Sequence, residues 1–192
     1  MPFNGVLKTG NGSQTPEGEE SREENRGWNR EKNMAGFPSF STLWDNYPLV
    51  SKYSGRTAMI NAAGLGTHLY GANTCAIRLS YALIHSGHEI SIEKGQFNWS
   101  EERATRATGR YKDAKYIIRV ATMRQYLERV LGPAQIVSKK ESDFKGSKGI
   151  IVFQDCPKFT SATGHVDLYD GSRCVNKGFF DQCNTIRLFI LP

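Results

Sequence analysis

No apolar run in this chain is long enough to cross a membrane. Its longest apolar stretches are short, such as Leu188–Leu191, whereas a spanning helix needs about 20 apolar residues. The first residues also lack the basic segment followed by an apolar one that marks a classical signal peptide. We therefore expect neither insertion into a membrane nor export by the general secretory route.

Cysteine and histidine are scarce, at four residues each. The cysteines are Cys75, Cys156, Cys174 and Cys183. No two of them form a CxxC motif and no histidine lies at metal-ligand spacing from them, so neither a metal site nor a cofactor is expected. Cys174 and Cys183 enclose an eight-residue loop and are predicted to form a disulfide in an oxidising compartment, the alternative being two free thiols.

The chain also lacks the signatures of nucleic-acid binding, since it has no RNA-binding motif and no Lys/Arg cluster interleaved with aromatics. Its net charge is nevertheless +6. Six Glu against five Lys/Arg give residues 1–36 a charge of about −1, so the remaining residues carry about +7. A basic surface favours an anionic partner. With nucleic acid not expected, the anionic cell wall is the other candidate.

The composition divides the chain near residue 36. Residues 1–36 are rich in Gly, Asn, Ser and Glu and cannot bury enough apolar surface to offset their ordering entropy, so they are predicted to be a flexible polar N-terminal tail. Residues 37–192 then form one domain. Its helix-like patterns come first, and strand-like patterns follow at residues 148–154, 164–170 and 185–191. This order predicts an α+β fold with helices packed on an antiparallel sheet.

Cys75 is the candidate nucleophile. It lies in the first turn of a predicted helix that is apolar over much of its girth. The unpaired N–H groups and partial positive charge of a helix N-terminus stabilise a thiolate, and the same N–H groups can receive the oxyanion of a tetrahedral intermediate. The alternative is that Cys75 is an ordinary small core residue.

His165 is the candidate general base. It follows Gly164 at the start of a predicted strand, and alternation places His165, Asp167 and Tyr169 on one face. A histidine on a strand that faces a helix N-terminus gives the geometry of a Cys–His pair. The alternative is a polar surface histidine at a strand end.

Two residues compete to orient the histidine ring. If Asp170-Gly171 is a two-residue hairpin turn, then His165 faces Asn176, which suits a Cys-His-Asn site. The rival is Asp181, which the loop between Cys174 and Cys183 would fold back toward His165. The sequence favours Asn176.

The chain resembles a known family at these motifs. The stretches Asn73–Tyr81 (NTCAIRLSY) and Gly164–Gly171 (GHVDLYDG) are similar to the fourth family of type VI secretion amidase effectors. Four further stretches fit in the same order, over roughly residues 37–192: Phe37–Phe40, Tyr116–Val120, Ser142–Phe144 and Phe189–Pro192.

The resemblance implies a papain-like fold of the NlpC/P60 type. It implies an antibacterial toxin that hydrolyses the bond between γ-D-glutamate and meso-diaminopimelate in the peptidoglycan stem peptide. It further implies binding to a component of the secretion machine, injection into the periplasm of a target cell, and neutralisation by a cognate immunity protein. The family's Cys and His correspond to Cys75 and His165. Its third catalytic residue, an Asp, corresponds to Asn176 by ungapped counting and to Asp181 by the Asp-Gln-Cys tripeptide, so this position stays open.

Two other functions remain compatible with the same residues. The first is a non-catalytic module that binds the cell wall or a protein on the same fold. The second is a cysteine protease that acts on proteins, since the substrate is selected by loops whose shape the sequence does not give.

Overall fold

The computed structural model describes residues 35–92, 104–106, 114–160, 162 and 164–192. The predicted flexible tail, residues 1–36, lies almost wholly outside these ranges, so the domain boundary stays a prediction. Within the described ranges, every helix falls short of the length and apolarity that a bilayer crossing requires.

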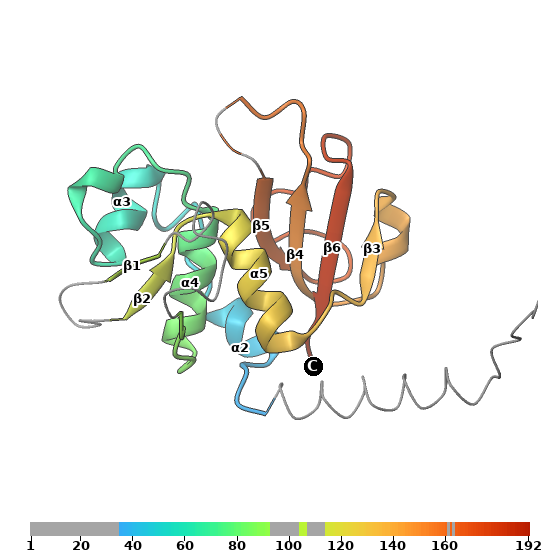
Figure 1. Cartoon of the computed structure of the whole chain (residues 1–192), viewed down its shortest axis with the longest axis horizontal. Helices are drawn as coiled ribbons and strands as arrows, with labels where there is room; N and C mark the ends of the chain where they lie inside the picture. The colour runs from blue at the N-terminus through green and yellow to red at the C-terminus, as the bar shows by residue number, and fades with distance from the viewer. Residues whose placement is uncertain (1–34, 93–103, 107–113, 161, 163) are drawn as a thin grey trace, which may run out of the picture.

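Helices dominate the first half of the described chain and strands the second (Figure 1). The helical elements are α2 Phe40–Asp45, α3 Gly55–Ala62, η1 Thr67–Leu69, α4 Cys75–His85, α5 Val120–Leu131 and η3 Glu141–Phe144. The strands are β1 Ala104–Arg106, β2 Lys115–Ile117, β3 Ile136–Ser138, β4 Gly149–Gln154, β5 Gly164–Tyr169 and β6 Thr185–Ile190.

The main sheet of the described residues has four antiparallel strands in the order β3-β6-β4-β5. The apolar, β-branched sequence of β4 suits its central position, where both faces are covered. Strand β5 lies at one edge, and α4 packs on it. Strands β1 and β2 form a separate small antiparallel pair. The predicted α+β fold with helices on an antiparallel sheet is confirmed.

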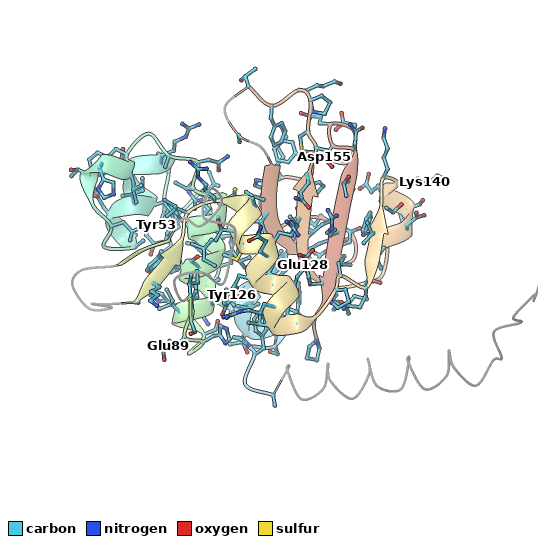
Figure 2. The ribbon with its side chains drawn as sticks, viewed as in Figure 1. Tyr53, Glu89, Tyr126, Glu128, Lys140 and Asp155 are labelled. Carbon is cyan, nitrogen blue, oxygen red and sulfur yellow. A yellow bond between two sulfur atoms is a disulfide. The ribbon has the colours of Figure 1, made fainter. Side chains whose placement is uncertain are left out.

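The sheet separates two apolar cores because side chains alternate along its strands. On one face, Val152 and Val166 pack with Leu79 of α4 and Met123 of α5, all fully buried. Figure 1 shows α5 in front of this sheet and α4 beside β5. The other face belongs to a second cluster that includes Phe153. Asp155 directly follows β4, and its label in Figure 2 marks the end of the sheet at which β4 finishes.

Gly164, the residue before His165, has no room for a side chain. A Cβ atom there would lie 2.4 Å from the carbonyl oxygen of Phe153 and 3.3 Å from the Val120 side chain. We expect Gly164→Ala to push β5 away from β4 and to destabilise the fold by about 1–3 kcal/mol. Urea unfolding measures this loss. Gly71→Ala is the matched control, since a Cβ at Gly71 meets nothing within 4 Å; equal stability of the two variants would contradict the prediction.

Candidate active site

Cys75 is the first residue of α4, as the sequence predicts. The helix begins here because the Oδ1 atom of Asn73 accepts a hydrogen bond from the Cys75 backbone N–H at 3.1 Å. The N-cap residue Thr74 makes no side-chain capping hydrogen bond. Cys75 is only 5% exposed and is part of the apolar core. It also lines two cavities, both of which include Asn73. The Cys75 backbone N–H therefore already donates to Asn73, whereas the sequence suggests the N–H groups of this helix start as donors to an oxyanion.

His165 is the second residue of β5. Its ring contacts Phe179 edge-on, with ring centroids 4.9 Å apart, and lies 6.1 Å from the ring of Phe153. Its side chain is 16% exposed. His165 and Cys75 line one cavity of about 240 Å³, because α4 packs on β5 at the edge of the sheet. The structure thus brings together the two residues that the sequence proposed as a pair.

Asp167, two residues further along β5, is the carboxylate nearest to the histidine. Its Oδ2 atom lies 3.7 Å from Nε2 of His165, an ion-pair distance, and its side chain is fully buried. The backbone N–H groups of Leu168, Asn176 and Lys177 donate to this carboxylate. Alternation along the strand places Asp167 on the same face as His165, but the sequence alone gives Asp167 no role. The i, i+2 spacing was the signal.

Asp167 and Cys75 determine the charge state of the histidine. Burial alone lowers the pKa of His165, but interaction with the Asp167 carboxylate and with Cys75 outweighs burial and raises that pKa to about 9. The imidazole therefore holds its second proton at neutral pH. A positive ring beside a cysteine is the arrangement that stabilises a thiolate.

The two candidates for the orienting residue lie in different places. Asn176 lines the cavity with Cys75 and His165, but its Oδ1 atom accepts a hydrogen bond from the Val50 backbone N–H at 3.3 Å. Its Nδ2 atom donates to Asp167 at 3.4 Å. Asp181 is exposed, and it is not among the described residues that line this cavity.

The register that placed Asn176 opposite His165 is wrong. Asp170 and Gly171 are not a two-residue turn, because Tyr169 pairs with Cys174 around a four-residue loop. The Asp170 carboxylate holds this loop by accepting from the backbone N–H groups of Ser172 and Arg173. The pairing therefore shifts by two residues and brings Asn176 beside Asp167.

The predicted disulfide between Cys174 and Cys183 is also wrong. Cys183 bonds to Cys156, and Cys174 is a free, buried thiol. Gln154 at the end of β4 pairs with Thr185 at the start of β6. Cys156 lies just after β4 and Cys183 just before β6, so this strand pairing brings the two cysteines together. Spacing along the chain favoured the wrong partner because it ignores strand pairing.

The Cys156–Cys183 bridge joins residues 27 positions apart. Loop-closure entropy then gives a stabilisation of about 3–4 kcal/mol. We expect a reducing agent, or Cys156→Ser, to lower the unfolding free energy by this amount in urea titrations. Cys174→Ser is the control and should leave the effect of the reducing agent in place. Insensitivity of the unmodified chain to reduction would contradict the prediction.

No group of three or more metal-ligating side chains occurs among the residues that the structure describes. The cleft contains the Cys75 thiol and the His165 imidazole, and the Asp167 carboxylate lies next to the imidazole.

The chain matches a known family over the segment that contains the cleft. The sequence model described as "Type VI secretion system (T6SS), amidase effector protein 4", Tae4, matches residues 71–189, which include both Cys75 and His165. The chain belongs to this family. Tae4 members are peptidoglycan-hydrolysing amidases delivered to target cells by the type VI secretion system, so the chain is an amidase effector of this kind.

Solved Tae4 structures have the same papain-like fold. The chain is similar to Tae4 from Salmonella typhimurium bound to the immunity protein Tai4 from Enterobacter cloacae, with 28% identity and a TM-score of 0.60 over 81% of this chain and 99% of that one. It is similar to Tae4 from Enterobacter cloacae at 25% identity and TM-score 0.60, over 81% and 97%. The Tae4–Tai4 complex from Enterobacter cloacae, at 24% identity, TM-score 0.66 and coverage of 81% and 99%, shares the fold. A search of curated protein sequences gives no match.

Proposed function

We propose that the chain hydrolyses the amide bond between γ-D-glutamate and meso-diaminopimelate in the peptidoglycan stem, with Cys75 as nucleophile and His165 as acid and base. The observation that carries the proposal is the shared cavity of Cys75 and His165, with the Asp167 carboxylate 3.7 Å from Nε2 of the imidazole. Membership in an amidase effector family supports the reaction class.

In the acylation step, the Cys75 thiolate attacks the carbonyl carbon and the carbonyl oxygen becomes an oxyanion. The His165 imidazolium then donates its proton to the departing amine, the C–N bond breaks, and a thioester remains on Cys75. Neutral His165 next removes a proton from water, which attacks the thioester. The released acid is the γ-carboxyl of glutamate, and the thiolate–imidazolium pair is restored.

In this mechanism, Asp167 orients the imidazole ring of His165 and stabilises its positive charge. It is fully buried and receives three backbone N–H groups, so its position is fixed before substrate arrives. Asn176 braces Asp167 and the Val50 segment from the side. We therefore assign to Asp167 the orienting role that the sequence predicts for Asn176, and Asn176 supports Asp167 through a hydrogen bond.

Asn73 is our candidate for the oxyanion donor. Its Oδ1 atom accepts from the Cys75 backbone N–H, and the side chain lines both cavities that meet at Cys75. The Nδ2 end is then a donor next to the reacting carbonyl. We expect Asn73→Ala to lower kcat by about 10²–10³-fold with little change in KM, measured on a soluble stem peptide. A change in KM alone would contradict this role.

The site of action and the partners follow from the family. Solved Tae4 proteins are bound to Tai4 immunity proteins. We infer that this chain acts in the periplasm of the target cell, binds a component of the secretion machine for delivery, and is neutralised by a cognate immunity protein. Its basic charge suits the anionic wall.

The decisive experiment is digestion of purified sacculi and of a synthetic L-Ala–γ-D-Glu–meso-diaminopimelate peptide, with products identified by mass spectrometry. We expect a new free γ-carboxyl on glutamate and a new free amine on diaminopimelate. Binding to sacculi without release of products would make the chain a wall-binding module. Cleavage of casein in place of the stem peptide would make it a protease.

A further inference from the structure

Two arginines line the same cavity as Cys75 and His165. They are Arg56, from the first turn of α3, and Arg78, one turn after Cys75 in α4. None of the described residues that line this cavity is acidic. An anionic group of a bound substrate would therefore meet two guanidinium groups beside the nucleophile.

Arg78 is a buried cation. It is only 5% exposed, and its guanidinium donates to the carbonyl oxygens of Pro48 and Tyr53. Tyr53 is labelled on the α3 side of the molecule in Figure 2. These acceptors are neutral, and none of the ion pairs in the described part of the chain includes Arg78. A buried charge is costly unless hydrogen bonds and nearby charges compensate for it. Two carbonyl oxygens and the Asp167 carboxylate do so here, and they hold the guanidinium at the cavity wall.

Arg56 is exposed but held in place. Its Nη1 atom donates to the carbonyl oxygen of Gly71 at 2.8 Å, which ties α3 to the loop that leads to Cys75. The side chain of Ser54, the N-cap of α3, makes no capping hydrogen bond. The start of α3 therefore adds a partial positive charge on the same side of the cavity.

The charges around the cavity do not cancel. A thiolate at Cys75 and an imidazolium at His165 are neutral together, and Arg78 offsets the nearby carboxylate of Asp167. Arg56 is left as a surplus positive charge. One carboxylate on the substrate would balance it.

The substrate that we propose has such a carboxylate. When D-glutamate is linked through its γ-carboxyl, its α-carboxyl stays free, separated from the scissile carbonyl carbon by three carbon atoms. An ordinary peptide bond between α-linked residues has no free carboxylate at this place. The cavity of about 240 Å³ exceeds the share of several water molecules, about 30 Å³ each, and so has room for this group.

We propose that Arg56 and Arg78 form a carboxylate subsite that binds the free α-carboxyl of the γ-linked D-glutamate and so selects wall peptides over proteins. This inference rests on the proposed function, since it assigns the binding of that substrate. Arginine suits the role because its planar fork binds a carboxylate through two parallel hydrogen bonds.

The test uses two synthetic stem peptides that differ only at the α-position of D-glutamate, one with the free carboxylate and one with the amide. A charged hydrogen bond is worth about 1.5–3 kcal/mol, so we expect kcat/KM to favour the carboxylate peptide by about 10–150-fold. Arg56→Gln should remove this preference by slowing only the carboxylate peptide. Arg78→Lys should reduce the preference in part.

Two control variants carry the same charge change elsewhere. Arg173, replaced in Arg173→Gln, lies on the loop after β5. Arg119, replaced in Arg119→Gln, lines the second cavity at Cys75, of about 440 Å³. Both should keep the preference. An unmodified chain without preference, an Arg56→Gln variant that slows both peptides equally, or loss of the preference in Arg119→Gln would each overturn the inference.

Binding separates this inference from the proposed reaction. The affinities of both peptides for Cys75→Ala, with and without Arg56→Gln, are measured by calorimetry. If the unmodified chain cuts neither peptide but Cys75→Ala prefers the carboxylate and the double variant does not, the subsite stands while the proposed bond falls. Equal affinity for both peptides overturns the subsite, whatever the chain cleaves.

Discussion

Replacement of Cys75 by alanine is expected to abolish wall hydrolysis, with kcat lower by roughly 10⁵–10⁶-fold. The physical reason is that no other described residue in the cleft can form the thioester, because Cys174 is a buried thiol in a different core and Cys156 and Cys183 are joined to each other. Release of soluble fragments from sacculi, followed by mass spectrometry, measures the loss.

Cys174→Ala is the matched control for this experiment. It removes the other free thiol, and burial raises the pKa of Cys174 well above its usual range, so this thiol stays protonated. We expect near-normal turnover and a modest loss of stability. Comparable activity in Cys75→Ala and the unmodified chain would refute the cysteine mechanism, and unfolding curves of both variants show whether the fold is intact.

Asp167→Asn should have the second-largest effect, a loss in kcat/KM of roughly 10²–10⁴-fold with a changed pH profile. His165 keeps its proton below its pKa of about 9 and loses it as the pH rises through that value. Activity that depends on the imidazolium therefore falls above about pH 9. Removal of the Asp167 charge lowers the pKa of His165, so the fall should begin at lower pH. Initial rates between pH 5 and 10 measure the shift.

Asp181→Asn is the matched control for Asp167→Asn, because it makes the same change at an exposed carboxylate outside the cavity. It should leave both the rate and the pH profile unchanged. Asn176→Ala should fall between the two, since it removes a brace of Asp167 but not the charge. If Asp181→Asn shifts the pH profile and Asp167→Asn does not, then Asp181 and not Asp167 is the residue that orients the His165 ring.

The predictions for Cys75 and Asp167 both concern the residues that determine the charge of the His165 ring. The imidazole is partly buried between aromatic rings, which by itself disfavours its charge. Interactions with the fully buried Asp167 carboxylate and with Cys75 reverse that preference. Both residues lie on β5, and the strand fixes the distance between them. The fold therefore positions the Asp167 carboxylate beside the ring before substrate binds.

Several elements were predictable because their patterns are local. The sequence places a helix start at Cys75 and strands at residues 148–154, 164–170 and 185–191, and the structure has α4, β4, β5 and β6 there. A long apolar helix and β-branched strands have strong periodicities that tertiary contacts do not override. The short strand β3 and the helix α3 have weaker patterns, and the sequence alone does not predict them.

The errors share one physical cause. The Asp-Gly dipeptide predicts a two-residue hairpin after β5, but the Asp170 side chain accepts hydrogen bonds from two backbone N–H groups and the turn is wider. The short loop between Cys174 and Cys183 favours a disulfide between them, but pairing of β4 with β6 brings Cys156 to Cys183. In both cases the outcome depends on which segments meet in space, which spacing along the chain does not encode.

The sequence by itself determined that a cysteine begins a buried helix and a histidine opens a late strand, because capping and periodicity act within a few residues. Only the tertiary structure decided that the Asp167 carboxylate lies next to the histidine ring, that Asn176 donates a hydrogen bond to Asp167, and that Arg56 and Arg78 share the cavity with Cys75. Those relations join residues from separate helices, strands and loops. Their distances follow from the packing of α3 and α4 and from strand register rather than from local propensity.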